Sequence, residues 1–301
     1  MPAKNNVDIS FCIRAYNEER FMESKLNDLI PRLKMAGARS EIVMVIQGND
    51  DSYRIASSFR KEFKNLVIHR MQKPDFLKAT NFMIGKTKSD IIVIDDADNL
   101  FKGDIDRIVK IFKDPKVGGI IQFDVATREW LNDGHRLFDQ VYKEVQLKHH
   151  LKGNVVDSPI FYVHIWRKSA LRPPYATTLN DDTETTLRLQ TAGYEVIYDK
   201  ELSEHIENNP LQKKITVKGI FKRRLRTEKF RKQAKEVLNT DRFAIKNRIG
   251  EFVEAIFLTM GRANPAEFLG FMEYLIVIAL ATMAGKIKLL IKDDNKYVQV
   301  R

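Results

Sequence analysis

The chain of 301 residues contains a single cysteine, Cys12, so it cannot form an intrachain disulfide. Cys12 lies in an apolar run, which favours a small buried side chain over a nucleophile. The amino terminus, "MPAKNNVDIS", lacks the apolar stretch of a secretory signal, and the chain has no internal repeat and no low-complexity tract. With 44% hydrophobic and 30% charged residues, the composition indicates a folded protein, and the single cysteine fits a reducing compartment.

The net charge of +11 is concentrated in one segment. Residues 213–235 contain eleven Lys or Arg and one acid, Glu228, whereas the rest of the chain is nearly neutral. Such a block favours a polyanion or an anionic membrane surface. Nucleic-acid binding predicts aromatic residues interleaved with the basic ones, but the block contains only Phe221 and Phe230. We therefore expect a membrane surface as the partner of this segment, and no nucleic acid.

Two apolar segments, 251–260 and 268–285, follow the basic block. The second has one charge, Glu273, in 18 residues, which is the lower edge of the length that crosses a bilayer. A buried core helix is the alternative. Because basic residues flank the segment on both sides, we predict that residues 209–301 form a helical, membrane-associating region that spans the membrane or lies in its interface.

Strand-like apolar runs alternate with segments of helical periodicity in residues 1–208. This alternation predicts a parallel sheet with crossover helices, and the near-continuous apolar runs predict that both faces of the sheet are covered. The fold class expected for residues 1–208 is therefore α/β. The strands are expected at 7–15, 41–47, 66–70, 91–94, 118–125, 160–166 and 194–200, with a long helix near 130–150.

Acidic residues end the apolar strand in "SDIIVIDDADNLF", residues 89–101. Ligands of open parallel α/β sheets bind outside the carboxyl ends of the strands. Asp96 and Asp98 are two apart on an extended segment and should project to the same side, while Asp95 projects to the other. Two adjacent carboxylates suit Mg²⁺ or Mn²⁺ carrying substrate phosphates. A cap for the next helix is the alternative.

Four blocks stand in a specific order between residue 7 and about residue 205: "SFCIRAYNEERF", "EIVMVIQGNDDS", "KATNFMIGKTKSDIIVIDDADNL" and "NDDTETTLRLQTAGYEVIY". Together they resemble a family 2 glycosyltransferase with the GT-A fold. The resemblance implies a Rossmann-like, mostly parallel sheet and inverting transfer of a hexose from a GDP- or UDP-sugar. From the carboxyl third we expect a lipid-linked or membrane-associated glycan acceptor and a place at the cytoplasmic face of a membrane.

The resemblance also implies roles for individual residues. The turn after the first strand would line the nucleotide pocket. The segment Asp96-Ala97-Asp98, the D-x-D segment, would hold Mn²⁺ or Mg²⁺. His205 lies just beyond the last strand, where some relatives place a histidine on the metal. The residues implied in donor binding are Ala15, Tyr16, Asn17, Glu18, Gln47, Lys78, Asn81 and Asp96, and those implied in metal binding are Asp96, Asp98 and His205.

The general base is expected to be Asp182, which matches the second acid of the family's E-D pair. An acceptor hydroxyl is a poor nucleophile until a base removes its proton as it attacks the anomeric carbon. Asp181 is the alternative base, and both acids could instead cap the helix that follows.

The chain departs from the family pattern at several positions. Ile46 and Gln47 stand where two acids are usual, so the identity of the donor nucleotide stays undetermined. Gln47 could hydrogen-bond to the nucleotide in place of an acid. Arg14 replaces the usual Pro, and Met83 replaces the usual Gly.

Two other hypotheses remain. A sugar-phosphate nucleotidyltransferase of the same topology would need a Gly-rich basic loop after the first strand, which here reads "RAYNEER". A non-catalytic polyanion- or membrane-binding relative would not need Asp96, Asp98 and Asp182, all of which are present.

Overall fold

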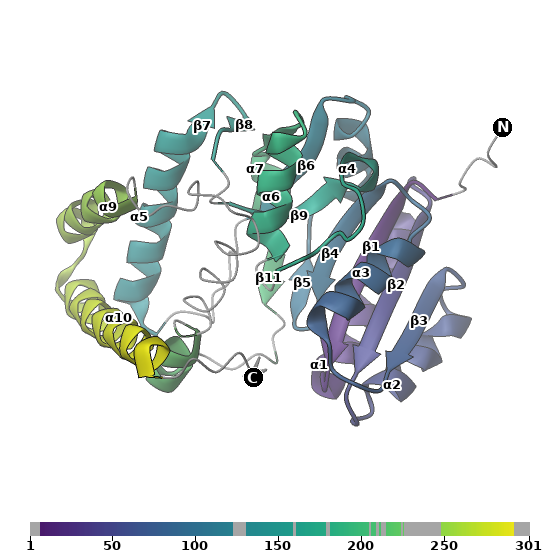
Figure 1. Ribbon diagram of the computed structural model, residues 1–301, viewed down its shortest axis with the longest axis horizontal. Helices are drawn as coiled ribbons and strands as arrows, with labels where there is room; N and C mark the ends of the chain where they lie inside the picture. The colour runs from purple at the N-terminus through teal and green to yellow at the C-terminus, as the bar shows by residue number, and fades with distance from the viewer. Residues whose placement is uncertain are drawn as a thin grey trace. The chain divides into compact units, whose positions relative to one another are not determined.

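The structure is a computed structural model that describes residues 7–122, 131–158, 161–178, 181–204, 206–208, 211, 215–223, 225 and 248–291 (Figure 1). The chain divides into two compact units, one formed by residues 1–126 with 152–212 and the other by residues 127–151 with 213–301. The helix near 130–150, predicted as part of a 1–208 domain, thus groups with the carboxyl-terminal third.

A nine-stranded sheet with the order β3-β2-β1-β4-β9-β6-β10-β8-β7 forms the centre of the first unit. Strands β1, β2, β3 and β4 are mutually parallel, β9 runs antiparallel between β4 and β6, and β10 is parallel to β6. The predicted mixed α/β fold with a mostly parallel sheet is confirmed. The strands are β1 (Ile9–Tyr16), β2 (Ser40–Gln47), β3 (Leu66–Met71), β4 (Ile91–Asp96), β6 (Val117–Gln122), β7 (Leu151–Lys152), β8 (Val155–Val156), β9 (Tyr162–Arg167) and β10 (Glu195–Ile197).

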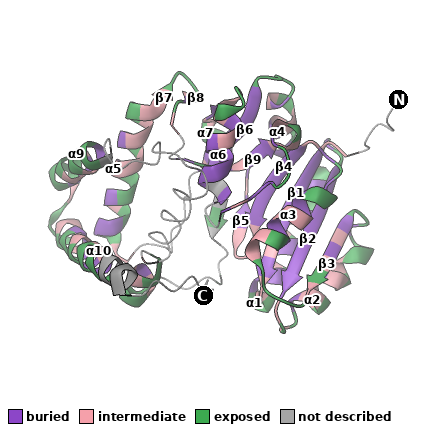
Figure 2. Ribbon diagram, in the orientation of Figure 1, coloured by how far each residue is buried: buried purple, intermediate pink, exposed green. Residues whose placement is uncertain are grey.

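Helices cover both faces of this sheet (Figure 1). Helices α1, α2 and α4 share one apolar core with alternate residues of β1, β2 and β4, whereas α3 contacts β1 and β2, and α6 contacts β9, from the other face. The buried strands are nearly continuous in Figure 2, as expected for strands that are covered on both sides. The helices are α1 (Glu19–Met35), α2 (Ser52–Ser58), α3 (Phe76–Lys86), α4 (Ile105–Ile111), α6 (Asp181–Thr191) and the short α7 (Lys200–Ser203).

Cys12 is fully buried in β1, as the sequence predicted. Burial raises the pKa of its thiol, so the side chain is an unreactive core residue at neutral pH.

A strand lies where none was expected. No strand pattern was evident beyond about residue 205, yet β11 (Ile206–Asn208) pairs antiparallel with β5 (Asn99–Phe101). A three-residue strand is too short to show alternation in sequence. This small sheet ties the chain that follows α7 to the chain that follows the D-x-D segment.

The second unit contains α5 (Asp133–His150), α9 (Arg248–Arg262) and α10 (Pro265–Ile291). Both α9 and α10 contact α5. A side chain at Gly134 would overlap the backbone of Glu267 and Phe271, so glycine allows α5 and α10 to approach closely. The shared core contains Phe138, Val141, Val145, Ala255, Phe271, Tyr274 and Val277.

Candidate active site

The acidic end of β4 directs its side chains to opposite faces of the sheet. Asp95 is 1% exposed and forms an ion pair with Lys25 of α1. Lys25 Nζ also donates to the carbonyl oxygen of Asn99 at 2.6 Å. Burial raises the pKa of Asp95, and the positive charge of Lys25 partly opposes this shift. Lys25 therefore fixes the loop that contains Asp98 from the face opposite to Asp96.

Replacing Lys25 with methionine is expected to lower the free energy of unfolding by about 3–5 kcal/mol, because Asp95 would remain as a buried carboxylate without its cation. Lys34→Met on the same helix is the matched control, since its ion pair with Glu62 is about half exposed; its cost should stay below about 1 kcal/mol. Urea unfolding followed by circular dichroism measures both. Adding Asp95→Leu to Lys25→Met should recover most of the loss, and equal stability of the two single variants would contradict this role.

Arg14, at the end of β1, connects three elements on the other face. Its Nε lies 3.2 Å from Asp96 Oδ1 on β4, and its Nη1 lies 2.7 Å from Asp181 Oδ2 at the start of α6. Nη1 also lies 3.3 Å from Thr80 Oγ1 on α3, and the guanidinium stacks over the Phe76 ring at 4.5 Å. The Arg14 side chain is only 12% exposed, so this contact holds the three elements together.

This arrangement brings the two predicted acidic clusters to one place. Asp96 and Asp181 are 85 positions apart in the chain but contact the same guanidinium. Burial raises the pKa of Asp96, but the charge and hydrogen bond of Arg14, together with the charges of His164 and Lys25, outweigh it, so the pKa of this carboxyl lies below its usual range. Asp96 is therefore ionised at neutral pH, with 45% of its side chain exposed.

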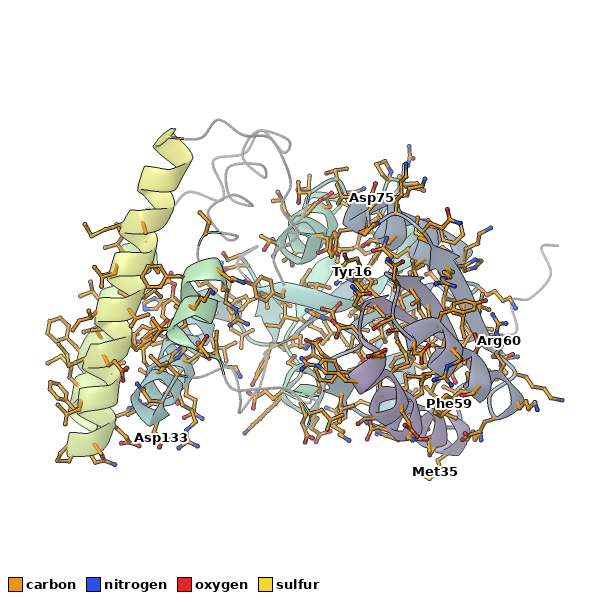
Figure 3. All side chains as sticks on the ribbon, turned by 90° about the horizontal axis from the view of Figure 1, so that it is seen from below. Tyr16, Met35, Phe59, Arg60, Asp75 and Asp133 are labelled. Carbon is orange, nitrogen blue, oxygen red and sulfur yellow. The ribbon has the colours of Figure 1, made fainter. Side chains whose placement is uncertain are left out.

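The turns after β1 and β2 interlock beside these acids. Asn17 has φ +53°, and its Oδ1 accepts a hydrogen bond from the Asn49 amide at 2.9 Å. Gly48 has φ +102°, and a Cβ there would overlap Asn17 Oδ1, so glycine is required. The Glu18 amide donates to Ser52 Oγ at 3.0 Å. Figure 3 labels Tyr16 at this edge of the sheet, half-buried at the end of β1.

Two residues predicted to bind the donor make contacts within the protein. Gln47 is buried, and its Nε2 donates to the carbonyl oxygen of Asp75 at 3.2 Å, at the start of α3. Asn81 Nδ2 donates to the carbonyl oxygens of Leu77 and Ala176 at 2.9 and 2.7 Å, and its Oδ1 accepts from the Ala176 amide at 3.1 Å. Asn81 thus ties α3 to the segment that leads into α6.

The other predicted residues differ in their surroundings. Ala15 is buried in β1, Lys78 is exposed on α3, and Asp98 is partly exposed in the turn after β4. His205 and the side chain of Asp182 lie outside the part of the chain that the structure describes. The backbone of Asp182 is in the first turn of α6, next to Asp181.

Glu184 is a residue of this region that the motif comparison did not single out. It is 1% exposed and accepts hydrogen bonds from the Thr177 and Thr178 amides at 2.9 and 2.8 Å. Arg188 Nη1 lies 3.2 Å from its Oε1. Glu184 therefore holds the segment before α6 in place. Its position three residues after Asp181, in "DDTE", is the sequence feature that could have indicated this residue.

The donor set fits a hard divalent cation. Asp96 and Asp98 supply carboxylate oxygens, which suit Mg²⁺ or Mn²⁺. Within the described ranges, no three His, Cys, Asp or Glu side chains gather into a complete metal site. Mg²⁺ is usually held by one or two carboxylates, with substrate phosphates and water as the remaining ligands.

Comparisons with known proteins agree with this architecture. The family model described as glycosyl transferase family 2 matches residues 10–172. Mannosyltransferase PcManGT from Pyrobaculum calidifontis, solved in complex with GDP-Man and Mn²⁺, is similar with a TM-score of 0.64 and 16% identity, over 96% of this chain and 88% of that one. S. aureus TarS 1-349 gives a TM-score of 0.48 and 15% identity over 91% and 80% of the two chains. The curated proteins contain no match. At this identity the mannosyltransferase shows the fold, which is GT-A.

Proposed function

Because the chain belongs to glycosyl transferase family 2, we propose that this glycosyltransferase moves a hexose from a nucleotide-diphospho-sugar to a membrane-associated acceptor, with inversion at the anomeric carbon. The observation that carries the proposal is the Arg14 bridge, because it places Asp96 of the D-x-D segment and Asp181 at the start of α6 around one guanidinium. A donor held at the first acid would thus lie beside residues of α6.

The donor site is proposed at the carboxyl ends of β1, β2 and β4. Asp96 and Asp98 would hold Mn²⁺ or Mg²⁺, which when bound stabilises the negative charge of the diphosphate leaving group. The interlocked turns at Asn17 and Gly48 would form the rim for the base and ribose. Gln47 and Asn81 are assigned to positioning, because their amides bond to the start of α3 and to the segment before α6.

Asp182 is proposed as the general base that takes the proton of the acceptor hydroxyl. Arg14 holds the neighbouring Asp181, and Glu184 holds the chain before α6, so the first turn of this helix has a defined position. A base delivered from the side opposite to the leaving group gives single displacement, which inverts the anomeric configuration.

The acceptor is proposed to be a lipid-linked or membrane-associated glycan, presented at the cytoplasmic face of a membrane. Among the described residues, one helix segment, Pro265–Ala284 of α10, has the length and composition that could cross a membrane. Together with the basic residues at 213–235, this segment supports attachment of the second unit to a membrane.

Donor binding is tested with a thermal-shift panel of GDP- and UDP-sugars, with Mn²⁺ or with EDTA. GDP-mannose is the first donor to test, because the similar mannosyltransferase was solved with GDP-Man and Mn²⁺. A donor at 100 times its Kd should add about 2.7 kcal/mol to the free energy of unfolding, and only when Mn²⁺ is present. Equal shifts in EDTA, or no shift with any nucleotide sugar, would contradict the proposed site. Release of pyrophosphate from a nucleoside triphosphate and a sugar phosphate would instead support the nucleotidyltransferase hypothesis.

A further inference from the structure

An exposed apolar stripe runs along α10. Its residues are spaced by three or four positions, so they lie on one side of the helix. Exposed residues follow the length of the helix in Figure 2. The stripe consists of Leu269 (70% exposed), Met272 (38%), Ile276 (58%), Leu280 (53%) and Met283 (60%).

A second stripe of the same kind runs along α9. Ile249, Val253, Phe257 and Met260 are between 43% and 68% exposed, again at spacings of three and four. Only two residues, Ala263 and Asn264, separate α9 from α10. Two consecutive helices thus each leave one apolar side uncovered. An ordinary protein surface exposes apolar residues singly and not as continuous stripes of this kind.

The other side of α10 is occupied by α5. Phe271 and Tyr274 belong to the core that α10 shares with α5, and His135 of α5 stacks on Tyr274 at 3.7 Å. Glu273 is the charge in the middle of the apolar segment, and its Oε2 accepts a hydrogen bond from Asn132 Nδ2 at 2.9 Å. The covered part of α10 is therefore the centre of the segment that has the length of a membrane span.

The outer side of α5 is charged. Arg136 and Asp139 are exposed on it, and Glu144 and Lys148, which are also exposed, form ion pairs with Arg262 and Glu254 of α9 at its flank. A charged side chain at the centre of a bilayer costs about 2.5–3.5 kcal/mol even by the lowest estimates. If α10 crossed the membrane, α5 would enter the hydrocarbon with it, because the two helices share one core.

We infer that α9 and α10 lie in the plane of one leaflet, with their two apolar stripes in the lipid and α5 facing water, and that α10 does not span the bilayer. The inference rests on the membrane attachment proposed above and specifies its geometry. The lipid is anionic, because eleven Lys or Arg lie in residues 213–235 and Lys286 and Lys288 lie near the end of α10.

Vesicle flotation tests whether the stripe is the lipid-binding surface. Ile276→Glu is expected to reduce the partition of the full-length protein into phosphatidylcholine vesicles containing 30% phosphatidylglycerol by roughly tenfold or more, since it replaces a lipid contact by a charge. Met35→Glu is the matched control: it puts the same charge at an apolar position of α1 that is 81% exposed, and binding should not change. Circular dichroism checks that both variants fold.

Two other outcomes of flotation would overturn the inference. Equal binding of Ile276→Glu and wild type would remove the stripe from the lipid contact. A wild-type protein that stays off the vesicles and dissociates from dimer to monomer on Ile276→Glu substitution would assign the stripe to a second copy of the chain.

Thiol labelling separates the in-plane arrangement from a span. In a Cys12→Ala background, Ala263→Cys and Lys288→Cys place single thiols before α10 and in its last turns. In sealed membrane vesicles of known orientation, a membrane-impermeant maleimide should reach both thiols from the same side. Labelling from opposite sides would show that α10 spans the membrane. This result would contradict the in-plane geometry but not the attachment of the protein to the membrane. Donor binding in solution depends on neither result, so a failure of the transferase proposal can be distinguished from a failure of the in-plane geometry.

Discussion

An Asp182→Asn variant is expected to transfer sugar about 10²–10⁴-fold more slowly than the wild type while binding the donor with unchanged affinity. Asparagine has nearly the shape of aspartate but cannot take a proton from the acceptor hydroxyl, and general-base catalysis contributes a factor of this size. Transfer is measured as radiolabelled sugar entering the lipid fraction of membranes from the source organism, and donor affinity is measured by calorimetry. An Asp182→Asn variant with full activity would remove Asp182 from the mechanism.

Asp181→Asn is the informative control for that experiment. Asp181 is buried, and its Oδ2 lies 2.7 Å from Arg14 Nη1, so one carboxylate oxygen is already committed to a guanidinium. We assign Asp181 to positioning, and its replacement should shift the KM for the donor more than kcat. If Asp181→Asn loses kcat and Asp182→Asn does not, the base is Asp181 and the two assignments are exchanged.

The sheet could be predicted because its signals are local. The strands at 9–16, 40–47 and 91–96 are apolar runs that end in polar residues, and the helices between them keep a regular apolar period. Alternation along the apolar run also predicts that Asp95 and Asp96 point to opposite faces of the sheet, and their partners Lys25 and Arg14 do come from opposite faces.

The contacts that organise the site could not be predicted in the same way. Arg14 was noted only as a departure from the usual proline, since nothing near it in sequence indicates partners 82 and 167 positions away. Gln47 and Asn81 have side chains that can bond equally well to a ligand or to backbone. Their amides bond to the backbone of the segments before α3 and α6, which only the tertiary structure shows.

The grouping of α5 with the carboxyl-terminal helices has a similar explanation. The periodicity of residues 133–150 indicates an amphipathic helix, but it does not identify the element that packs against the apolar face of this helix. Gly134 and His135 fit features of α10 more than 130 positions away. The sequence therefore leaves open whether residues 268–285 span the membrane or lie in its interface, and the packing of α5 against Phe271 and Tyr274 is the observation from which we infer the in-plane arrangement.

Asp98→Ala is expected to abolish the metal-dependent part of donor binding, lowering the affinity for the nucleotide sugar in Mn²⁺ by about 100-fold or more. Loss of a residue that only orients a metal ligand costs about 10–100-fold in metal affinity, so loss of a proposed ligand should cost at least the upper value. Asp98 is the residue to replace because Arg14 bonds to Asp96 Oδ1, so a change at Asp96 would also break the contact that holds α6 and α3 to β4.

Calorimetry with the donor identified by the panel, in Mn²⁺ and in EDTA, measures this effect. The residual affinity of Asp98→Ala in Mn²⁺ should equal that of the wild type in EDTA, because both lack the cation rather than the pocket. Asp133→Ala is the matched control, since Asp133 is an exposed carboxylate of the second unit whose ion pair with Arg136 is local. If Asp98→Ala kept the difference between Mn²⁺ and EDTA, the cation would have to bind elsewhere, and the carboxylates beside Arg14 would serve the fold instead of the donor.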